Sequence, residues 1–402
     1  MSHMFHKAMA FDQPLNDWKV GNVQFMDSMF SKAYLFNQPL HDWDVSKVKT
    51  MDSMFAGDSP VVGTDTTFNQ DISGWDVSSV ESMTSMFRGD ADFNKPVNNW
   101  NVSNVKDMSH MFSFAASFNQ AIVGWDVSEV ETMAFMFWGA ESFNQPLNDW
   151  GEKVGNVKSM ESLFDSAMLF NQPLDKWDVS NVECMAGTFG GAASFDQPLE
   201  KWEVGNVTNM AAMFAGALLF NQPLRAWADK VGKVQDMGGM FLDAVSFNQD
   251  IEDWDVSNVF AMNQMFWGAY SFNRPLNKWG GKVGNVVFTV SFVFPASIKR
   301  PEVSHHWCSF FPCFQHGMFL NATSFNQPLD EWKLSSLQMM ILMFHGASSF
   351  DQNLCSWTDY LPRNFSCEIG PDSGAFAGTS CPVPSKCSFD DLCHHCETTI
   401  VE

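Results

Sequence analysis

The chain has little positive charge, little tyrosine and no long apolar run. It contains 23 Lys and Arg against 46 Asp and Glu, which gives a formal net charge of −23. Such an acidic surface would repel phosphate groups, so we predict no nucleic-acid partner. The most apolar stretch, residues 286–298, includes Ser, Thr and Pro. It is shorter than the roughly 20 apolar residues that a spanning helix needs, so we also predict no membrane span.

The aromatic residues are used unevenly. There are only 3 Tyr, whereas there are 39 Phe and 16 Trp. Hydrophobic residues make up 45% of the chain and charged residues 17%, which is enough apolar material for a packed core. The skew among the aromatics indicates that one short template has been copied many times.

That template is a repeat of 25 residues, with the consensus F-N-Q-P-L-x-x-W-x-V-[SG]-N-V-x-x-M-x-x-M-F-x-x-A. Its anchor tryptophans are Trp18, Trp43, Trp75, Trp100, Trp125, Trp150, Trp177, Trp202, Trp227, Trp254, Trp279, Trp332 and Trp357. Three copies carry two extra residues after the Trp, within 151–153, 228–230 and 280–282, and one copy is lengthened within 56–67. The repeat therefore occurs about 13 times, with insertions that we expect in loops.

The spacing of apolar residues within a repeat predicts one short helix and one short strand. Val182, Met185, Phe189 and Ala192 fall on one face of a helix. The Ser or Gly before Asn-Val is a good helix N-cap, and the Pro of Phe-Asn-Gln-Pro-Leu favours extended backbone before it. We therefore predict an α/β solenoid in which stacked repeats share a continuous apolar column.

An asparagine follows the Phe in most repeats. Because stacked repeats bring equivalent residues together, we expect these side chains to form a structural ladder that satisfies turn backbone groups. The alternative is a ligand-binding role for the same column. The predicted ladder consists of Asn37, Asn69, Asn94, Asn119, Asn144, Asn171, Asn221, Asn248, Asn273 and Asn326.

The runs FNQPLNDWGEKVGNVKSMESLF and FNQPLDKWDVSNVECMAGTF resemble the repeats of BspA-like leucine-rich-repeat surface proteins. This bacterial-surface-protein repeat of 25 or 26 residues is also known as a mycoplasma domain of unknown function. The resemblance covers about residues 4–357. It implies a leucine-rich-repeat-like solenoid and, in bacterial members, adhesion at the cell surface, and it brings no catalytic residues.

The sequence after Trp357 departs from the repeat and is rich in cysteine. An array of repeats needs a cap at its end, so we predict a solenoid over 1–357 and a degenerate repeat with a Cys-rich cap over 358–402. The disulfide candidates are Cys355, Cys367, Cys381, Cys387, Cys393 and Cys396. Their pairing stays open. A zinc site at Cys393–Cys396 is the rival interpretation, but our prediction is that the chain holds no metal and no cofactor.

Two further segments break the pattern. Residues 290–315 share nothing with the repeat, and we interpret them as a retained intron in a eukaryotic gene. The chain opens partway through a repeat, because Met-Ser-His-Met-Phe at residues 1–5 recurs at 108–112. We therefore expect further residues upstream, including a signal peptide.

Function is less clearly indicated than architecture. No phosphate-binding Gly loop, nucleophile elbow or H-E-x-x-H motif occurs, so we predict that the protein is not an enzyme. Trp138 and Trp267 stand where other repeats carry small or polar residues, as contact points for a ligand or as local packing. The leading hypothesis is an extracellular or cell-surface binding scaffold for a protein or glycan ligand. The alternative is an intracellular scaffold for protein–protein interaction.

Overall fold

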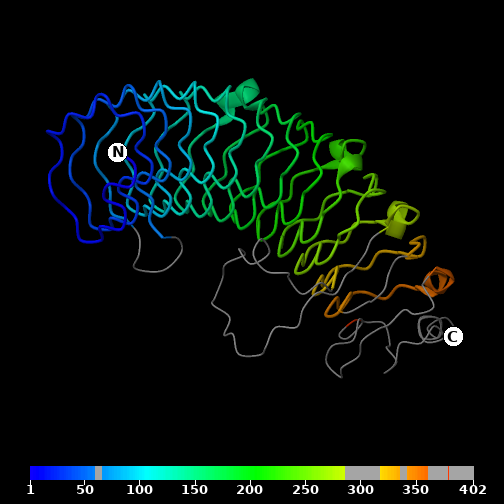
Figure 1. The fold of residues 1–402 in the computed structure, drawn as a ribbon. Helices are drawn as coiled ribbons and strands as arrows, with labels where there is room; N and C mark the ends of the chain where they lie inside the picture. Colours follow the sequence, from blue (N-terminus) through cyan, green and yellow to red (C-terminus); the bar gives the residue numbers. More distant parts are fainter. Residues whose placement is uncertain (59–65, 286–316, 336–341, 361–378, 380–402) are drawn as a thin grey trace, which may run out of the picture. The chain divides into compact units, whose positions relative to one another are not determined.

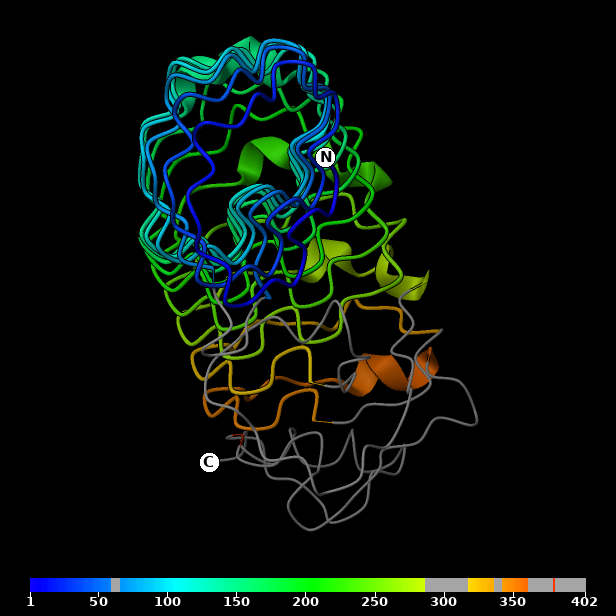
Figure 2. The ribbon, with the colours of Figure 1, turned by 60° about the vertical axis from the view of Figure 1, so that its left-hand side comes forward.

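The computed structural model describes residues 1–58, 66–285, 317–335, 342–360 and 379 (Figure 1). The chain divides into two compact units, Met1–Trp202 and Glu203–Glu402, which we call unit 1 and unit 2. In each unit one repeat makes one coil of the backbone, and successive coils stack on each other. Figure 2 shows unit 1 nearly end-on to its stack of coils, and the cyan traces nearly superimpose.

Neighbouring coils are joined by parallel backbone hydrogen bonds. In one coil the N–H groups of Met133, Phe135, Phe137 and Gly139 donate to the carbonyls of the next coil at 2.7–3.2 Å. The intervening N–H groups turn back to carbonyls of their own coil, as Met136 does to Met133 at 3.1 Å. Isolated parallel bridges mark the same contact, and in unit 1 they run Phe25, Thr50, Ser82, Asp107, Thr132, Ser159 and Cys184, each paired with the next. In unit 2 they join Asn209 to Asp236 and Asp236 to Ala261.

The consensus apolar residues of each coil face inward. In the coil that contains them, Trp125, Val130, Met133 and Phe137 are all fully buried. Equivalent rings stack from coil to coil, with 5.8 Å between the centroids of Phe112 and Phe137. Each such side chain contributes roughly 1.5–3 kcal/mol on burial. A coil therefore completes its core only against its neighbours.

The predicted helix in each repeat is wrong. The segment with Val182, Met185, Phe189 and Ala192 is a series of turns, although all four side chains are buried. Within it Gly187 and Gly191 have φ of 62° and 61°, which a right-handed helix does not accept. Tight turns of three residues, each followed by a left-handed residue, give the same apolar spacing as a helix face.

The predicted strand in each repeat is also wrong, so the α/β class does not hold. No strand and no α-helix occurs among the residues described. Adjacent Phe-Asn-Gln-Pro segments are linked through the asparagine side chains instead of a backbone ladder. The expected caps are likewise turns, since the Ser180 N–H donates to the Asp178 carboxylate at 3.0 Å.

The helical elements that are present are short 3₁₀ helices. They are η1 (Asn148–Val154), η2 (Arg225–Trp227), η3 (Val231–Lys233), η4 (Asn277–Trp279), η5 (Val283–Asn285) and η7 (Cys355–Asp359). The first five lie in the three repeats that carry two extra residues after the Trp. The extra residues are thus taken up as one turn at a corner of the coil.

Candidate functional site

The asparagine ladder lies at the rim of the coils, where its members are half-buried. Each side-chain oxygen accepts the backbone N–H of the equivalent residue in the next repeat, at 3.0 Å for Asn119 with Asn144 and 2.9 Å for Asn221 with Asn248. The following Gln adds a second donor, as Gln145 does to Asn119 at 3.0 Å. The structure thus uses these amide oxygens to join neighbouring repeats.

Two further ladders were not singled out in the sequence. From Trp43 onward, buried indole N–H groups of the anchor tryptophans donate to carbonyls of the preceding repeat, for example Trp125 to Val97 at 2.9 Å. The Asn of Asn-Val does the same at the exposed side, as Asn104 donates to the Ser78 carbonyl at 2.7 Å. The Trp recurs at one fixed place in each repeat and the Asn in many repeats, and this recurrence was the signal that could have identified the ladders.

The cysteine predictions fall almost entirely outside the described residues. Cys367, Cys381, Cys387, Cys393 and Cys396 lie there, and so does the rival zinc site. The backbone of Cys355 belongs to η7. Cys184 is a half-buried free thiol on the bridge row, and burial raises its pKa. Among the residues described, no group of His, Cys, Asp and Glu is placed to hold a metal ion.

The described coils have two residues with left-handed backbone, one just before the Met-Phe pair and one two residues after that Phe, except that the coil of Ser53 has only the first. Glycine or serine occupies many of these positions, as at Gly187 and Ser85. In two adjacent coils of unit 1, however, they are His110, Phe114 and Phe135, with φ of 58–60°. A left-handed residue with a side chain costs about 1–2 kcal/mol relative to glycine. Unusual residues in a strained conformation point to function.

These three residues and Trp138 form what we call the aromatic patch. His110 stacks on Phe135 with centroids 4.6 Å apart and planes 1° apart. Trp138 lies 5.3 Å from Phe135 and 4.4 Å from Phe114, tilted by about 55° to both. All four side chains are half-buried. The rings are in direct contact with each other, so the patch offers an outer aromatic surface and no slot between rings.

The patch has polar neighbours at equivalent positions of the adjoining coils. Arg88, Ser113, Trp138 and Asp165 each directly follow the Phe of consecutive repeats. Burial lowers the pKa of His110 to about 4, and the charge of Arg88 adds to that effect. The imidazole is therefore neutral at pH 7, with one donor and one acceptor nitrogen.

Asp165 is a carboxyl group at the far edge of this row, with only 8% of its surface exposed. It accepts hydrogen bonds from Ser166 at 2.9 Å and from Ser162 at 3.3 Å. The backbone of Gly190 in the next coil lies close to the Asp165 carboxyl group. A Cβ atom added to this glycine would be only 3.3 Å from the Cγ of Asp165. Burial raises the pKa of Asp165 to about 7, against the opposing effect of the two serines.

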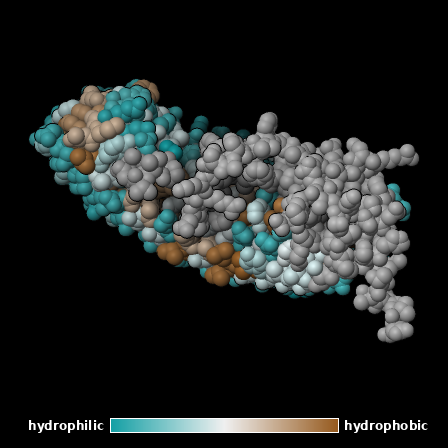
Figure 3. All heavy atoms as spheres, turned by 90° about the horizontal axis from the view of Figure 1, so that it is seen from below, coloured by the Kyte–Doolittle hydropathy of each residue, from teal (hydrophilic) through white to brown (hydrophobic). Residues whose placement is uncertain are grey.

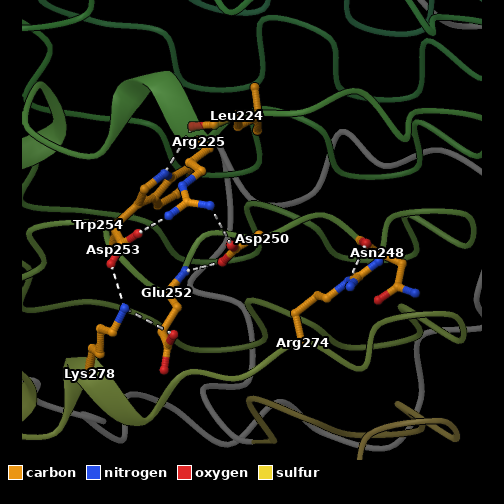
Figure 4. A network of polar contacts seen from close by, with 9 residues as sticks. All are labelled: Leu224, Arg225, Asn248, Asp250, Glu252, Asp253, Trp254, Arg274 and Lys278. Atoms are coloured by element: carbon orange, nitrogen blue, oxygen red, sulfur yellow. Dashed lines mark hydrogen bonds and ion pairs between the residues drawn. The ribbon is translucent and has the colours of Figure 1, made fainter.

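Unit 2 carries a different polar cluster, which we call the charge corner (Figure 4). Arg225 pairs with Asp253 at 3.0 Å and lies 3.6 Å from Asp250. Lys278 pairs with Asp253 at 2.8 Å and with Glu252 at 3.4 Å. The hydrogen bond between Lys278 and Asp253 lowers the pKa of Asp253 and raises that of Lys278. Arg225 and Lys278 therefore already have carboxylate partners, whereas Arg274, also drawn in Figure 4, donates to the backbone carbonyl of Asn248 at 2.8 Å.

Exposed apolar side chains occur mainly at the corner just before the Phe of a repeat. They include Leu35 and Leu169 in unit 1 and Leu219 and Tyr270 in unit 2, which are 58%, 55%, 57% and 44% exposed. On the face drawn in Figure 3, hydrophobic residues appear as separate spots between hydrophilic ones. Scattered exposed apolar residues of this kind need no functional explanation.

The family is identified by comparison with known proteins. Five consecutive stretches, residues 1–63, 59–154, 153–231, 228–299 and 314–365, match the family described as "Mycoplasma protein of unknown function, DUF285". The chain belongs to this family, which confirms the resemblance seen in its repeats. No curated protein and no solved structure matches the chain. The described residues include no helix that is long and apolar enough to span a membrane.

Proposed function

We propose that this protein is a non-catalytic binding scaffold that acts outside the cell or on its surface. Its consensus residues are used within the coils, since the apolar ones are buried and the Asn and Trp groups bond to neighbouring repeats. Many of the residues that differ between repeats lie on the outside, although some, such as Ser113 and Asp165, are buried. In such an architecture, binding specificity belongs to outward residues that depart from the repeat.

The aromatic patch is the observation that carries the proposal. It places four half-buried rings on the outside of two adjacent coils, at positions where Ser53, Ser85 and Ala56 show that small residues suffice. Aromatic residues concentrate binding energy at contact surfaces. The fold does not need them there, so a contact with a ligand accounts for their presence.

Reversion to the small residues of other repeats tests this role. The full chain, fluorescently labelled, is applied to intact cells and to surfaces coated with proteins or glycans. We expect Phe135→Ser and Trp138→Ala to reduce binding at least tenfold, whereas Leu169→Ser, an exposed apolar control in the same unit, leaves it unchanged. Binding that survives both patch substitutions, in variants with unaltered circular dichroism, would contradict the proposal.

The location outside the cell rests on the cysteine-rich sequence after Trp357, since disulfides persist in oxidising compartments. Thiol counting on protein from its native source tests it. Oxidised Cys367, Cys381, Cys387, Cys393 and Cys396 would support an extracellular scaffold. Fully free thiols would instead favour the alternative, a scaffold that assembles protein partners inside the cell.

A further inference from the structure

The chain contains four Asn-x-Ser/Thr sequons, at Asn101, Asn206, Asn321 and Asn364. A sequon is the acceptor sequence for N-linked glycans in exported proteins. Because the repeat is itself rich in Asn, the sequence alone does not show which of the four is suited to carry a glycan. Asn364 lies outside the described residues. The structure separates the other three by the exposure of each side chain and by its contacts with neighbouring coils.

Asn101 is an exposed side chain directly after an anchor Trp. Its Oδ1 accepts the backbone N–H of Ser103, the last residue of the sequon, at 3.2 Å. The same turn is made by aspartates in other repeats, and Asp76 accepts the N–H of Ser78 at 3.1 Å. The turn therefore needs only a side-chain oxygen as acceptor, which Asp and Asn supply equally well.

The amide nitrogen is what Asn101 adds to this turn. Among the residues that directly follow the anchor tryptophans, only Asn101 is an asparagine. No hydrogen bond of its Nδ2 occurs among the residues described. A glycan bonded to Nδ2 would leave Oδ1 in place to accept the N–H of Ser103. The modification would thus preserve the turn, and the exposed position leaves space for the sugar.

The other two described sequons are part of the contacts between coils. Asn321 is half-buried with φ of 55°, and its Oδ1 lies so close to the next coil that Gly346 has no room for a Cβ. Asn206 holds the repeat position of Asn104, whose nitrogen faces a carbonyl of the preceding coil, and its Oδ1 accepts Nζ of Lys233 at 2.7 Å. A sugar at either position would meet a neighbouring coil.

We propose that Asn101 is an N-glycosylation site. Its Nδ2 attacks the anomeric carbon of an oligosaccharide linked to a lipid diphosphate, the donor that a glycosyltransferase of the secretory pathway uses. A bond forms from Nδ2 to this carbon, and the bond from the carbon to the diphosphate oxygen breaks. The lipid diphosphate leaves with the electron pair, and one amide proton passes to a base of the transferase. The assignment rests on the proposed function, because only an exported chain meets this donor.

Glycan mapping of the full chain from its native source tests the site. Peptide N-glycosidase in heavy-oxygen water converts a glycosylated Asn to labelled Asp, which mass spectrometry of the peptides detects residue by residue. We expect the occupancy at Asn101 to be at least tenfold higher than that at Asn206 or Asn321.

Variants of the full chain, secreted from cultured eukaryotic cells, separate the sequon from the fold. Asn101→Asp copies the turn of other repeats, and Ser103→Ala keeps the backbone N–H that the turn uses. Both should abolish the glycan at residue 101 and leave thermal unfolding of the deglycosylated protein unchanged. Ser103→Thr should retain the glycan. Asn104→Gln, a change in an exposed Asn outside any sequon, should leave the occupancy unchanged.

Two outcomes would overturn the assignment: an Asn101 that is unmodified in either preparation, or an occupancy at Asn206 or Asn321 as high as that at Asn101. Thiol counting on the same native protein distinguishes this failure from that of the proposed location. If the cysteines after Trp357 are oxidised and Asn101 is unmodified, only the glycan site is wrong. If the thiols are free as well, the location outside the cell is also wrong.

Discussion

Arg88 in unit 1 and Arg225 in unit 2 lie on the outside of the same kind of coil, but their surroundings are opposite. Arg225 is part of the charge corner, where Asp250, Glu252 and Asp253 balance it and Lys278. Arg88 is half-buried beside aromatic rings, and the described residues provide it with no paired carboxylate.

The difference shows how one repeat can serve two purposes on its outer surface. The charge corner is self-sufficient, since opposite charges from successive coils neutralise each other and give the exposed pairs their modest stabilisation. In the part of the chain that the structure describes, Arg88 has no paired carboxylate, and Nδ1 of His110 in the aromatic patch has no hydrogen-bond partner. We infer from this contrast that the first surface serves solubility and register, and the second serves binding.

The largest expected effect is a loss of stability that distinguishes a core residue from its neighbour in the aromatic patch. Phe137→Ala removes a fully buried ring and should cost about 3–5 kcal/mol, whereas Trp138→Ala, at the next residue, should cost less than about 1.5 kcal/mol. Urea unfolding of both variants measures the difference. Equal losses would show that the patch is part of the packing, which is the rival interpretation of Trp138.

The second prediction contrasts the carboxyl groups of the two surfaces. Burial raises the pKa of Asp165 to about 7, well above the usual range of a carboxyl group, so the folded state holds its proton after the unfolded state has released it. The contribution of Asp165 to the free energy of unfolding is fully present below about pH 4. It is lost as the pH rises toward 7, by up to about 4 kcal/mol. Asp253 has a lowered pKa, so its contribution is instead lost on acidification.

Asp165→Asn mimics the protonated form and tests this direction of the pH dependence of stability. The variant should be more stable than the parent at pH 8 and equally stable at pH 4, as measured by thermal unfolding across the pH range. Asp253→Asn is the matched control, and it should show no gain at pH 8. A gain for Asp165→Asn that does not depend on pH would contradict the assignment.

The third prediction concerns the left-handed backbone conformation that occurs both in the aromatic patch and in other coils. Ala212 in unit 2 occupies the repeat position of Phe135, with φ of 54° against 60°. Ala212→Gly should therefore stabilise the protein by about 1 kcal/mol, because glycine accepts the left-handed conformation without penalty. Ala211→Gly, one residue earlier and without a positive φ, should destabilise it by about 0.5–1 kcal/mol. If both glycines destabilised the chain equally, the strain argument for the patch would be wrong.

The sequence was sufficient to predict the repeats, the family and which side chains face inward. It did not distinguish a helix from a series of turns, because Val182, Met185 and Phe189 keep a helical spacing in both. What decides between them is the left-handed backbone at Gly187 and Gly191, and elsewhere residues as ordinary as Ser85 and Phe135 adopt it. Hydrogen bonds between coils offset the cost of the left-handed conformation, and the sequence of one repeat does not reveal these bonds.

The candidate site was predictable in part. Trp138 departs from the consensus and was singled out for that reason, whereas Arg88 and Ser113 were missed because each is unremarkable within its own repeat. Aligning the repeats places all three directly after a Met-Phe pair. That alignment would have revealed the row, but the burial of Ser113 and the half-burial of Arg88 depend on side-chain packing.

The smallest expected effects are the changes in the free energy of unfolding when Arg225 and Arg88 are replaced, and the two changes have opposite signs. Arg225→Met breaks exposed ion pairs and should cost less than about 1 kcal/mol, an effect that salt reduces further. Arg88→Met removes a half-buried charge and keeps an apolar stem, so it should leave stability unchanged or raise it by up to about 1 kcal/mol. Paired urea titrations at low and high salt measure both. A loss on Arg88→Met comparable to that on Arg225→Met would mean that Arg88 has a stabilising partner within the protein.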